Sequence, residues 1–81
     1  MYYLYILYSI KRNRYYVGYT SNLDNRIKEH NTNHKGFTGQ TGDWSLVYKE
    51  VFNKKQEAAI RERTIKNWKS RKLIEKLFAI S

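Results

Sequence analysis

Tyrosines crowd the start of the chain, and seven of the eight lie within the first nineteen residues. A phenol ring can fill a core or stack on a base, and its hydroxyl can donate, accept or transfer a proton. Eleven residues separate Tyr5 from Tyr16, ten more lead to Arg26, and four more lead to His30. These intervals make the four residues candidates for one site.

Arg26 and His30 lie four positions apart, an interval that places two side chains on the same face of an α-helix. Both border an apolar stripe formed by Leu23 and Ile27, so we expect them at the edge of the core. From that edge a side chain can reach over a neighbouring sheet. A solvated basic face for Arg26 and a structural role for His30 are the alternatives.

Glu62 stands on the apolar side of a predicted helix in the second half of the chain. At 100° per residue it falls inside the arc defined by Ala58, Ala59 and Ile65. A carboxylate on an inward face is costly unless it is paired or binds a metal ion, and an ion pair with Arg26 is one explanation. The chain has no cysteine and two histidines, so a bound metal would need carboxylates, which suits Mg²⁺.

The charge of the chain is strongly basic, with 16 Lys and Arg against 7 Asp and Glu and a formal net charge of +9 at pH 7. This balance indicates a polyanionic partner, with nucleic acid ahead of an anionic membrane surface. The segment 54–76 alone has nine basic and three acidic residues, and we expect its cations to contact phosphates and Trp68 to lie in the core. The candidate nucleic-acid-binding residues are Lys54, Lys55, Arg61, Lys66, Lys69, Arg71 and Lys72.

Two strands and a helix must position the tyrosines and Arg26. Residues 2–9 and 14–20 are rich in aromatic and β-branched side chains with a polar link between them, a pattern typical of a β-hairpin. Ser21 with Asp24 fits a capping box, which predicts a helix from Asn22 to about residues 31–33. The polar stretch 32–43 then predicts a loop.

A third strand and two more helices complete the predicted order. Residues 44–52 favour a strand, and a helix is predicted from Lys54 to about Trp68, with Asn53 and Gln56 as a second capping pair. Lys69-Ser70 ends this helix, and a closing helix is marked by Leu73, Ile74, Leu77 and Phe78. The order β-β-α-β-α-α predicts an α+β fold, with helices flanking a small three-stranded antiparallel sheet.

The register of the hairpin decides which tyrosines share a face. If its loop holds four residues, Ser9 lies opposite Arg14 and Tyr5 lies opposite Gly18. Tyr5 and Tyr16 then point to the same face as diagonal neighbours, and Gly18 leaves open space beside the Tyr5 ring. Such a face could be the floor of a ligand site, or its rings could be core, and the loop length decides which residues it holds.

Length and composition bound the architecture. With 81 residues, no proline, no internal repeat and no linker, we expect a single domain over residues 1–81. The first ten residues lack the basic segment of a signal peptide, and no apolar run approaches membrane-spanning length. We therefore expect a cytoplasmic protein with no membrane partner. We expect a monomer, with an oligomer as the alternative.

Four short motifs, taken in order, resemble the GIY-YIG nuclease superfamily. They are Tyr5, then Tyr16-Val17-Gly18, then Leu23, Arg26 and His30, then Glu57-Ala58, Glu62 and Ile65-Lys66. Each motif alone is weak, but their order and spacing match over nearly the whole chain. The chain looks similar to the small stand-alone bacterial proteins of that superfamily.

The resemblance implies a role for each matching residue of the hairpin. Tyr5 would act as a general base toward water, Tyr16 would assist it and orient the phosphate, and Gly18 matches the glycine of the second motif. A tyrosine base needs its pKa lowered from about 10, and a nearby cation and metal ion act in that direction.

On the helices, the resemblance implies that Arg26 stabilises the charge of the phosphorane, that His30 is a helper, and that Glu62 binds one divalent ion, Mg²⁺ or Mn²⁺. Two departures from the superfamily pattern stand out. Tyr3-Leu4-Tyr5 replaces Gly-Ile-Tyr, and the end of the chain has no equivalent of a late asparagine, whose position Asn67 does not fit.

The function implied is that of a metal-dependent endonuclease that hydrolyses DNA phosphodiester bonds, with DNA expected ahead of RNA. We expect no second domain that selects a sequence, so specificity would follow DNA shape or damage, as in repair or recombination. A non-catalytic nucleic-acid-binding module on the same fold is the alternative. A third interpretation is an interaction domain whose charge serves solubility.

Overall fold

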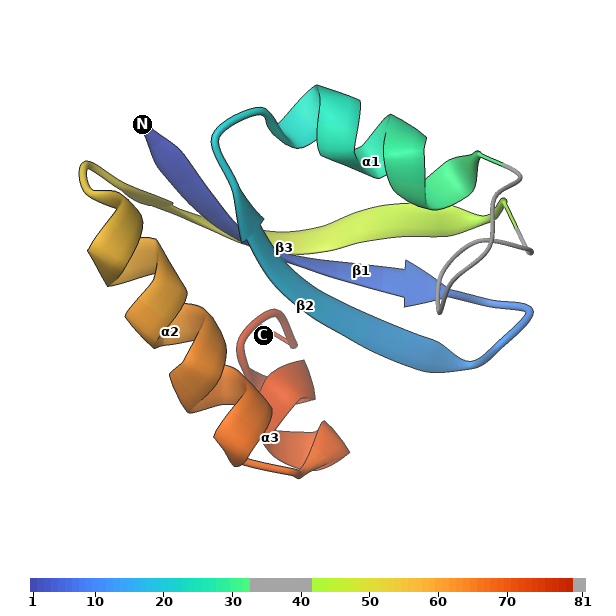
Figure 1. Ribbon diagram of the computed structural model, residues 1–81. Helices are drawn as coiled ribbons and strands as arrows, with labels where there is room; N and C mark the ends of the chain where they lie inside the picture. The colour runs from blue at the N-terminus through green and yellow to red at the C-terminus, as the bar shows by residue number, and fades with distance from the viewer. Residues whose placement is uncertain (33–41, 80–81) are drawn as a thin grey trace.

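The computed structural model describes residues 1–32 and 42–79 (Figure 1). The order and type of the elements agree with the predicted α+β fold, and no helix in these ranges is long and apolar enough to span a membrane. The predicted loop over 32–43 lies mostly outside the described residues. The elements are β1 (Tyr2–Ser9), β2 (Arg14–Thr20), α1 (Leu23–Asn31), β3 (Trp44–Phe52), α2 (Lys55–Asn67) and α3 (Arg71–Lys76).

The sheet has the strand order β2-β1-β3, with β1 in the centre and both pairs antiparallel. Tyr5 lies opposite Gly18 and Leu7 opposite Tyr16, so the hairpin loop holds four residues as predicted. Asn13 closes this loop with φ 52°, a left-handed conformation that asparagine tolerates better than most residues. The register therefore places Tyr5 and Tyr16 on one face.

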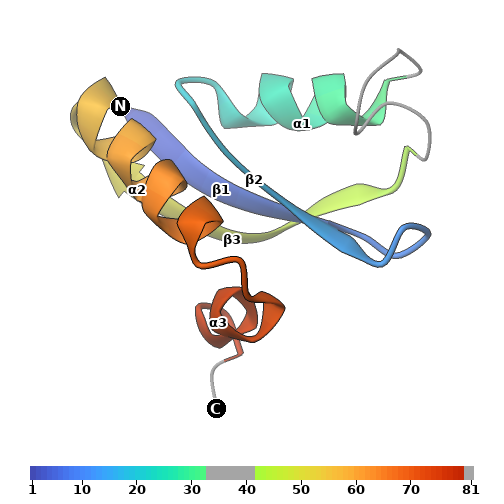
Figure 2. The ribbon, with the colours of Figure 1, turned by 60° about the horizontal axis from the view of Figure 1, so that its bottom comes forward.

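Each face of the sheet has its own apolar cluster. On one face, Tyr5 and Leu7 of β1 are buried with Trp44, and the partly buried residues packed against them are Tyr16, Leu23 and Ile27. On the other face, Leu4 and Ile6 of β1 are buried with Val17 and Ile65, beside side chains of α3. Figure 2 shows α1 on one side of the sheet and α3 on the other. Because β1 is covered on both faces, it has the nearly continuous apolar sequence of a central strand.

The start of α1 differs by one residue from the prediction. Its N-cap is Asn22, whose Oδ1 accepts a hydrogen bond from Asn25 N–H at 3.1 Å, so the capping box of Ser21 and Asp24 is wrong. The reason is local, because Thr20 Oγ1 accepts the Asn22 N–H at 3.1 Å and the backbone stays extended up to that residue. Asparagine is as good an N-cap as serine, so the helix loses nothing by the shift.

The start of α2 also differs from the prediction. Its N-cap is Lys54, whose ammonium cannot accept a hydrogen bond, so the predicted capping pair of Asn53 and Gln56 is wrong. The helix is held instead by packing, since Ala58 and Ile65 are both fully buried. Helices in proteins take most of their stability from such packing rather than from their ends.

The break between α2 and α3 falls where the sequence predicts it. Lys69 has φ 50°, the left-handed conformation that commonly follows the end of a helix. Ser70 Oγ then accepts a hydrogen bond from Leu73 N–H at 3.3 Å and caps α3. Trp68 packs against the apolar cluster on this face, as expected.

Candidate active site

The centre of the candidate site is a buried hydrogen bond between Tyr5 and His30. Tyr5 Oη lies 2.9 Å from His30 Nε2, and the two residues are 2% and 7% exposed. Tyr5 comes from the central strand and His30 from the last turn of α1, so the sheet and the helix together fix the pair. A phenol and an imidazole in this contact can exchange a proton.

Gly18 makes room for the Tyr5 hydroxyl. A Cβ at position 18 would lie 2.6 Å from Tyr5 Oη, 2.8 Å from Tyr5 Cζ and 3.2 Å from Tyr16 Cε1. The prediction that Gly18 leaves open space beside the Tyr5 ring is wrong, because the end of the Tyr5 phenol fills that space. Glycine is therefore required for the packing of Tyr5 rather than for a ligand.

Tyr16 completes an aromatic cluster around this pair. Its ring centroid lies 4.6 Å from that of His30 and 6.3 Å from that of Tyr5, and Trp44 lies against it edge-on at 6.4 Å. Tyr16 belongs to the edge strand β2 and is only partly buried. Of the two phenols, it is therefore the one that a substrate could reach directly.

Asn31 ties the end of α1 to the sheet, a contact that the sequence did not suggest. Its side-chain amide donates to Trp44 O at 2.9 Å, and its Oδ1 accepts from Trp44 N–H at 2.8 Å. This pair of bonds imitates a strand pairing at the start of β3. Because Asn31 follows His30, the clamp holds the imidazole in position over the sheet.

Arg26 lies on the exposed side of α1. Its Nη1 is 3.6 Å from Glu29 Oε1, and both side chains are about half exposed. Among the ion pairs of the described residues, the expected alternative of an Arg26–Glu62 pair is not found. Arg26 therefore keeps a guanidinium that a phosphate could bind.

Glu62 lies on α2, which packs against the sheet. Its Oε2 lies 3.2 Å from Lys66 Nζ, and its side chain is 22% exposed. The same ammonium sits 5.7 Å from the centroid of the Tyr16 ring. Lys66 thus links the carboxylate to the aromatic cluster, a position that the sequence analysis did not foresee.

The electrostatic balance at Tyr5 favours the neutral phenol. Burial is the main cause that raises its pKa well above the usual value, and the neighbouring Tyr16 adds to it. The charge of Arg26 lowers this pKa and that of Glu62 raises it, so both groups act on the Tyr5 hydroxyl. The expected lowering by a nearby cation is present but is outweighed by burial.

A metal ion at this site would have one protein carboxylate as its ligand. Within the described residues, no group of three or more His, Cys, Asp or Glu side chains could hold an ion. Glu62 is partly exposed and stands beside the aromatic cluster, which fits an ion such as Mg²⁺ that keeps several waters and binds substrate phosphates. In this structure one oxygen of the Glu62 carboxylate forms an ion pair with Lys66.

The predicted nucleic-acid-binding cations divide into three groups. Arg61 donates to both oxygens of Glu50 at 2.9 and 3.0 Å, and Arg71 donates to Glu75 at 3.1 Å, so these two are held within the fold. Lys66 stands at the site, as described above. The remaining predicted cations are exposed, and they are Lys54, Lys55, Lys69 and Lys72.

Two surface hollows flank the candidate site, and neither is lined by Tyr5 or Tyr16. One lies between the hairpin loop and the junction of α2 and α3. The other is lined by Tyr3, by Lys49 and by residues at the start of α1. Tyr3 therefore stands at the rim of the site face, where the superfamily has glycine.

The geometry can be compared with known proteins. Residues 1–75 match the model of the GIY-YIG catalytic domain. The chain is 45% identical to a UPF0213 protein of Clostridium perfringens over 82% of its length and 71% of that protein, and 43% identical to one of Staphylococcus haemolyticus over 82% and 80%. The solution NMR structure of a UPF0213 protein from Bacillus halodurans has a TM-score of 0.61 and 34% identity, covering 98% of this chain and 84% of that one.

The names of these relatives state no activity. Tyr5, Tyr16, Gly18 and the candidate residues of the helices all fall within the matched range 1–75. The chain belongs to the GIY-YIG catalytic domain family.

Proposed function

We propose that this protein is a metal-dependent endonuclease that hydrolyses DNA phosphodiester bonds. The observation that carries the proposal is the buried Tyr5–His30 hydrogen bond, on which the charges of Arg26 and Glu62 both act. An acid–base pair, a guanidinium and a carboxylate are the groups that phosphodiester hydrolysis needs. Membership of the GIY-YIG family supports the same reaction class.

Tyr5 and His30 would manage the proton of the attacking water. Because the phenol is neutral at physiological pH, Tyr5 Oη can take a proton from water only as it gives up its own. His30 Nε2, at 2.9 Å, is positioned to accept that proton. The water oxygen then forms its bond to phosphorus, and the bond from phosphorus to the leaving sugar oxygen breaks.

Arg26 and Tyr16 would hold the reacting phosphate. A guanidinium can donate two parallel hydrogen bonds to phosphate oxygens, and the partial exposure of Arg26 leaves it accessible. The charge that develops on those oxygens strengthens this contact in the transition state, which is where it helps the rate. Tyr16, on the edge strand, can donate from its hydroxyl to the same group.

Glu62 would hold the metal ion. When bound, a Mg²⁺ ion would supply Lewis-acid stabilisation of negative charge on the phosphate. The protein's own part is to release Glu62 from Lys66, whose ammonium can then turn to a phosphate oxygen instead. An exposed ion pair of this kind is worth only about 0.2–1 kcal/mol, so the exchange is not prevented.

The test is a cleavage panel with supercoiled plasmid, nicked duplex and branched DNA, each with Mg²⁺, Mn²⁺ or EDTA. Glu62→Gln is the decisive variant, and Glu57→Gln is its matched control on the exposed first turn of α2. We expect metal-dependent cutting by the wild type and by Glu57→Gln, with strong loss in Glu62→Gln. Cutting that is unchanged in Glu62→Gln would overturn the metal assignment.

The second candidate function is non-catalytic binding of nucleic acid on the same fold. The observations that favour it are the raised pKa of Tyr5 and the occupation of Glu62 by Lys66. It predicts salt-sensitive DNA binding with no cleavage in any metal. The same panel, read together with a binding titration, separates the two functions.

A further inference from the structure

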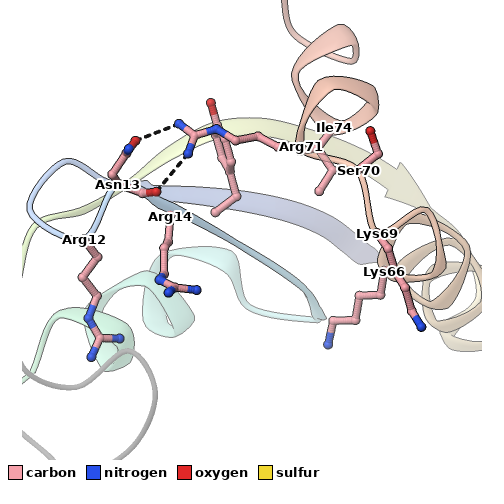
Figure 3. A pocket seen from close by; sticks show the side chains of 9 residues that line it. Arg12, Asn13, Arg14, Lys66, Lys69, Ser70, Arg71 and Ile74 are labelled. Atoms are coloured by element: carbon pink, nitrogen blue, oxygen red, sulfur yellow. Dashed lines mark hydrogen bonds between the residues drawn. The ribbon is translucent and has the colours of Figure 1, made fainter.

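A basic hollow lies between the β1–β2 loop and the junction of α2 and α3 (Figure 3). Its volume is about 590 Å³, and its lining contains five cationic side chains and no carboxylate. Two of the cations pair with carboxylates that lie outside this lining, Lys66 with Glu62 and Arg71 with Glu75. The excess of positive charge in the lining indicates an anionic ligand. The five are Arg12, Arg14, Lys66, Lys69 and Arg71.

Arg71 has a structural role in this hollow. Its guanidinium donates to Asn13 O at 3.0 Å, to Asn13 Oδ1 at 2.7 Å and to Glu75 Oε2 at 3.1 Å. These bonds connect the hairpin loop to α3. We therefore assign Arg71 a structural role at the edge of the hollow and do not include it among the residues that bind a ligand there.

Arg14 and Lys69 are different, because neither forms an ion pair within the described part of the chain. Both are exposed. In Figure 3 the side chains of Arg12, Arg14, Lys66 and Lys69 extend to one side, away from the contact of Arg71 with Asn13. The hollow thus presents several positive groups to the same region of solvent.

The backbone on both sides of the hollow is unusual. Asn13 and Lys69 are the non-glycine residues with positive φ in the described ranges, at 52° and 50°, and both line this hollow. A lysine in the left-handed region costs free energy that glycine would avoid. Retaining a cation at position 69 is consistent with a use for its charge.

The hollow adjoins the candidate active site. Arg14 precedes Tyr16 by two residues on β2, so the two side chains share a face and their Cα atoms lie about 6.6 Å apart. The ammonium of Lys66 lies over the Tyr16 ring, 5.7 Å from its centroid. A DNA strand advances about 3.4 Å of helix axis per nucleotide, so a phosphate one or two nucleotides from the reacting one falls within reach.

We propose that Arg14, Lys66 and Lys69 form a subsite for the backbone phosphates that flank the reacting phosphate of a DNA strand. This inference rests on the proposed function, since it takes Tyr16 and Arg26 as the place of the reacting phosphate. Contacts with backbone phosphates position a strand without selecting a sequence. Arg14 is the residue that the sequence analysis missed, because it lies in the hairpin, apart from the basic segment 54–76.

The test is the salt dependence of DNA binding in EDTA, measured by fluorescence anisotropy with a short labelled duplex. The variant is Arg14→Gln with Lys69→Gln. Its matched control is Arg63→Gln with Lys76→Gln, which removes the same two types of exposed cation from α2 and α3 outside the hollow. Circular dichroism melting checks that both proteins are folded.

We expect the slope of log affinity against log salt to fall by about 2 in the Arg14/Lys69 variant, or about 1 per lost phosphate contact, and to change little in the control. Equal changes in the two variants would overturn the subsite, because they would report net charge alone. Since EDTA prevents metal-dependent cutting, this result is independent of the cleavage panel. Binding with the expected slope but no cutting in any metal would contradict the proposed function and leave the subsite standing.

Discussion

The two halves of the candidate active site are held in different ways. Tyr5 and His30 are buried and hydrogen-bonded to each other across the fold. Arg26 and Glu62 are partly exposed and charged, and each pairs with a residue of its own helix. The first half is fixed by packing of α1 on the sheet, whereas the second can change partners without disturbing the core.

This difference predicts which substitutions lower both stability and cleavage and which lower cleavage alone. In the buried half, a change alters packing and leaves polar groups unsatisfied, so stability and cleavage should fall together. In the exposed half, the ion pairs contribute little to stability, so cleavage should fall alone. The following experiments are arranged from the largest expected effect to the smallest.

Substitution of His30 by alanine should have the largest effect. It removes the proton acceptor of Tyr5, and a lost general base lowers a rate by about 10²- to 10⁴-fold. The Tyr5 hydroxyl is left buried without this partner, at a cost of about 1–3 kcal/mol in unfolding free energy. Cleavage kinetics and urea unfolding measure the two effects, with the exposed Lys28→Ala as control. A stable, fully active His30→Ala protein would refute the account of the buried half.

Substitution of Gly18 by alanine should push Tyr5 out of place. The new Cβ would lie 2.6 Å from the hydroxyl, and overpacking of this kind costs about 1–3 kcal/mol. A displaced catalytic group commonly lowers a rate by about 10²-fold. The double variant with Tyr5→Phe should show non-additive unfolding free energies, because the closest atom is then absent. Additive values would mean that the two residues are not in the predicted contact.

Substitution of Arg26 by alanine should lower cleavage and leave stability unchanged. A charged hydrogen bond to phosphate is worth about 1.5–3 kcal/mol, which corresponds to a loss of about 10- to 150-fold. The free energy of unfolding, measured by thermal melting, should change by less than about 0.5 kcal/mol, because the Arg26 side chain is half exposed. Arg26→Lys should recover only part of the rate, because an ammonium cannot form the two-pronged contact. Full recovery would argue against a bidentate phosphate contact.

Replacement of Lys66 by methionine should strengthen metal binding modestly. It removes the ammonium from Glu62, and an exposed pair worth about 0.2–1 kcal/mol predicts affinity for Mn²⁺ that is about 1.4- to 5-fold tighter. Electron paramagnetic resonance in the absence of DNA measures this, with Lys72→Met as the control for net charge. Identical affinities in the two variants would show that Lys66 does not shield Glu62.

The pH dependence of stability should differ at the two ends of the scale. Burial raises the pKa of Tyr5, so its contribution is complete below about pH 10 and is lost as pH rises further, and Tyr5→Phe should weaken this loss. The pKa of Glu50 is lowered overall. Burial acts to raise this pKa, but the hydrogen bonds from Arg61 and Tyr48 outweigh the effect of burial. Stability from Glu50 should therefore be lost as pH falls below 4.5. A melting temperature unaffected by Tyr5→Phe above pH 10 would contradict the Tyr5 assignment.

The fold could be predicted from the sequence because its signals are local. Aromatic and β-branched runs marked the strands, and the spacing in the hairpin gave the register that places Tyr5 opposite Gly18. The helix starts were less predictable, because Ser21 and Asn22 are both good caps and only the bond from Asn22 N–H to Thr20 decides between them. Such competition between neighbours is resolved by three-dimensional contacts.

The site could be predicted only in part, for a similar reason. Family spacing identified Tyr5, Arg26 and Glu62, but no pattern indicates that Lys66 pairs with Glu62 or that Asn31 clamps Trp44. These contacts join side chains that are brought together by the packing of the helices on the sheet. The pKa of Tyr5 was likewise out of reach, because it depends on burial, which the sequence does not quantify.

The most direct test of the central claim compares Tyr5→Phe with Tyr3→Phe in single-turnover cleavage of DNA. Both changes remove one hydroxyl from the same face of β1, but Tyr5 alone bonds to His30. The account predicts that Tyr5→Phe lowers the rate by about 10²- to 10⁴-fold while Tyr3→Phe stays close to the wild type. A Tyr5→Phe protein that cuts DNA at the wild-type rate would contradict it.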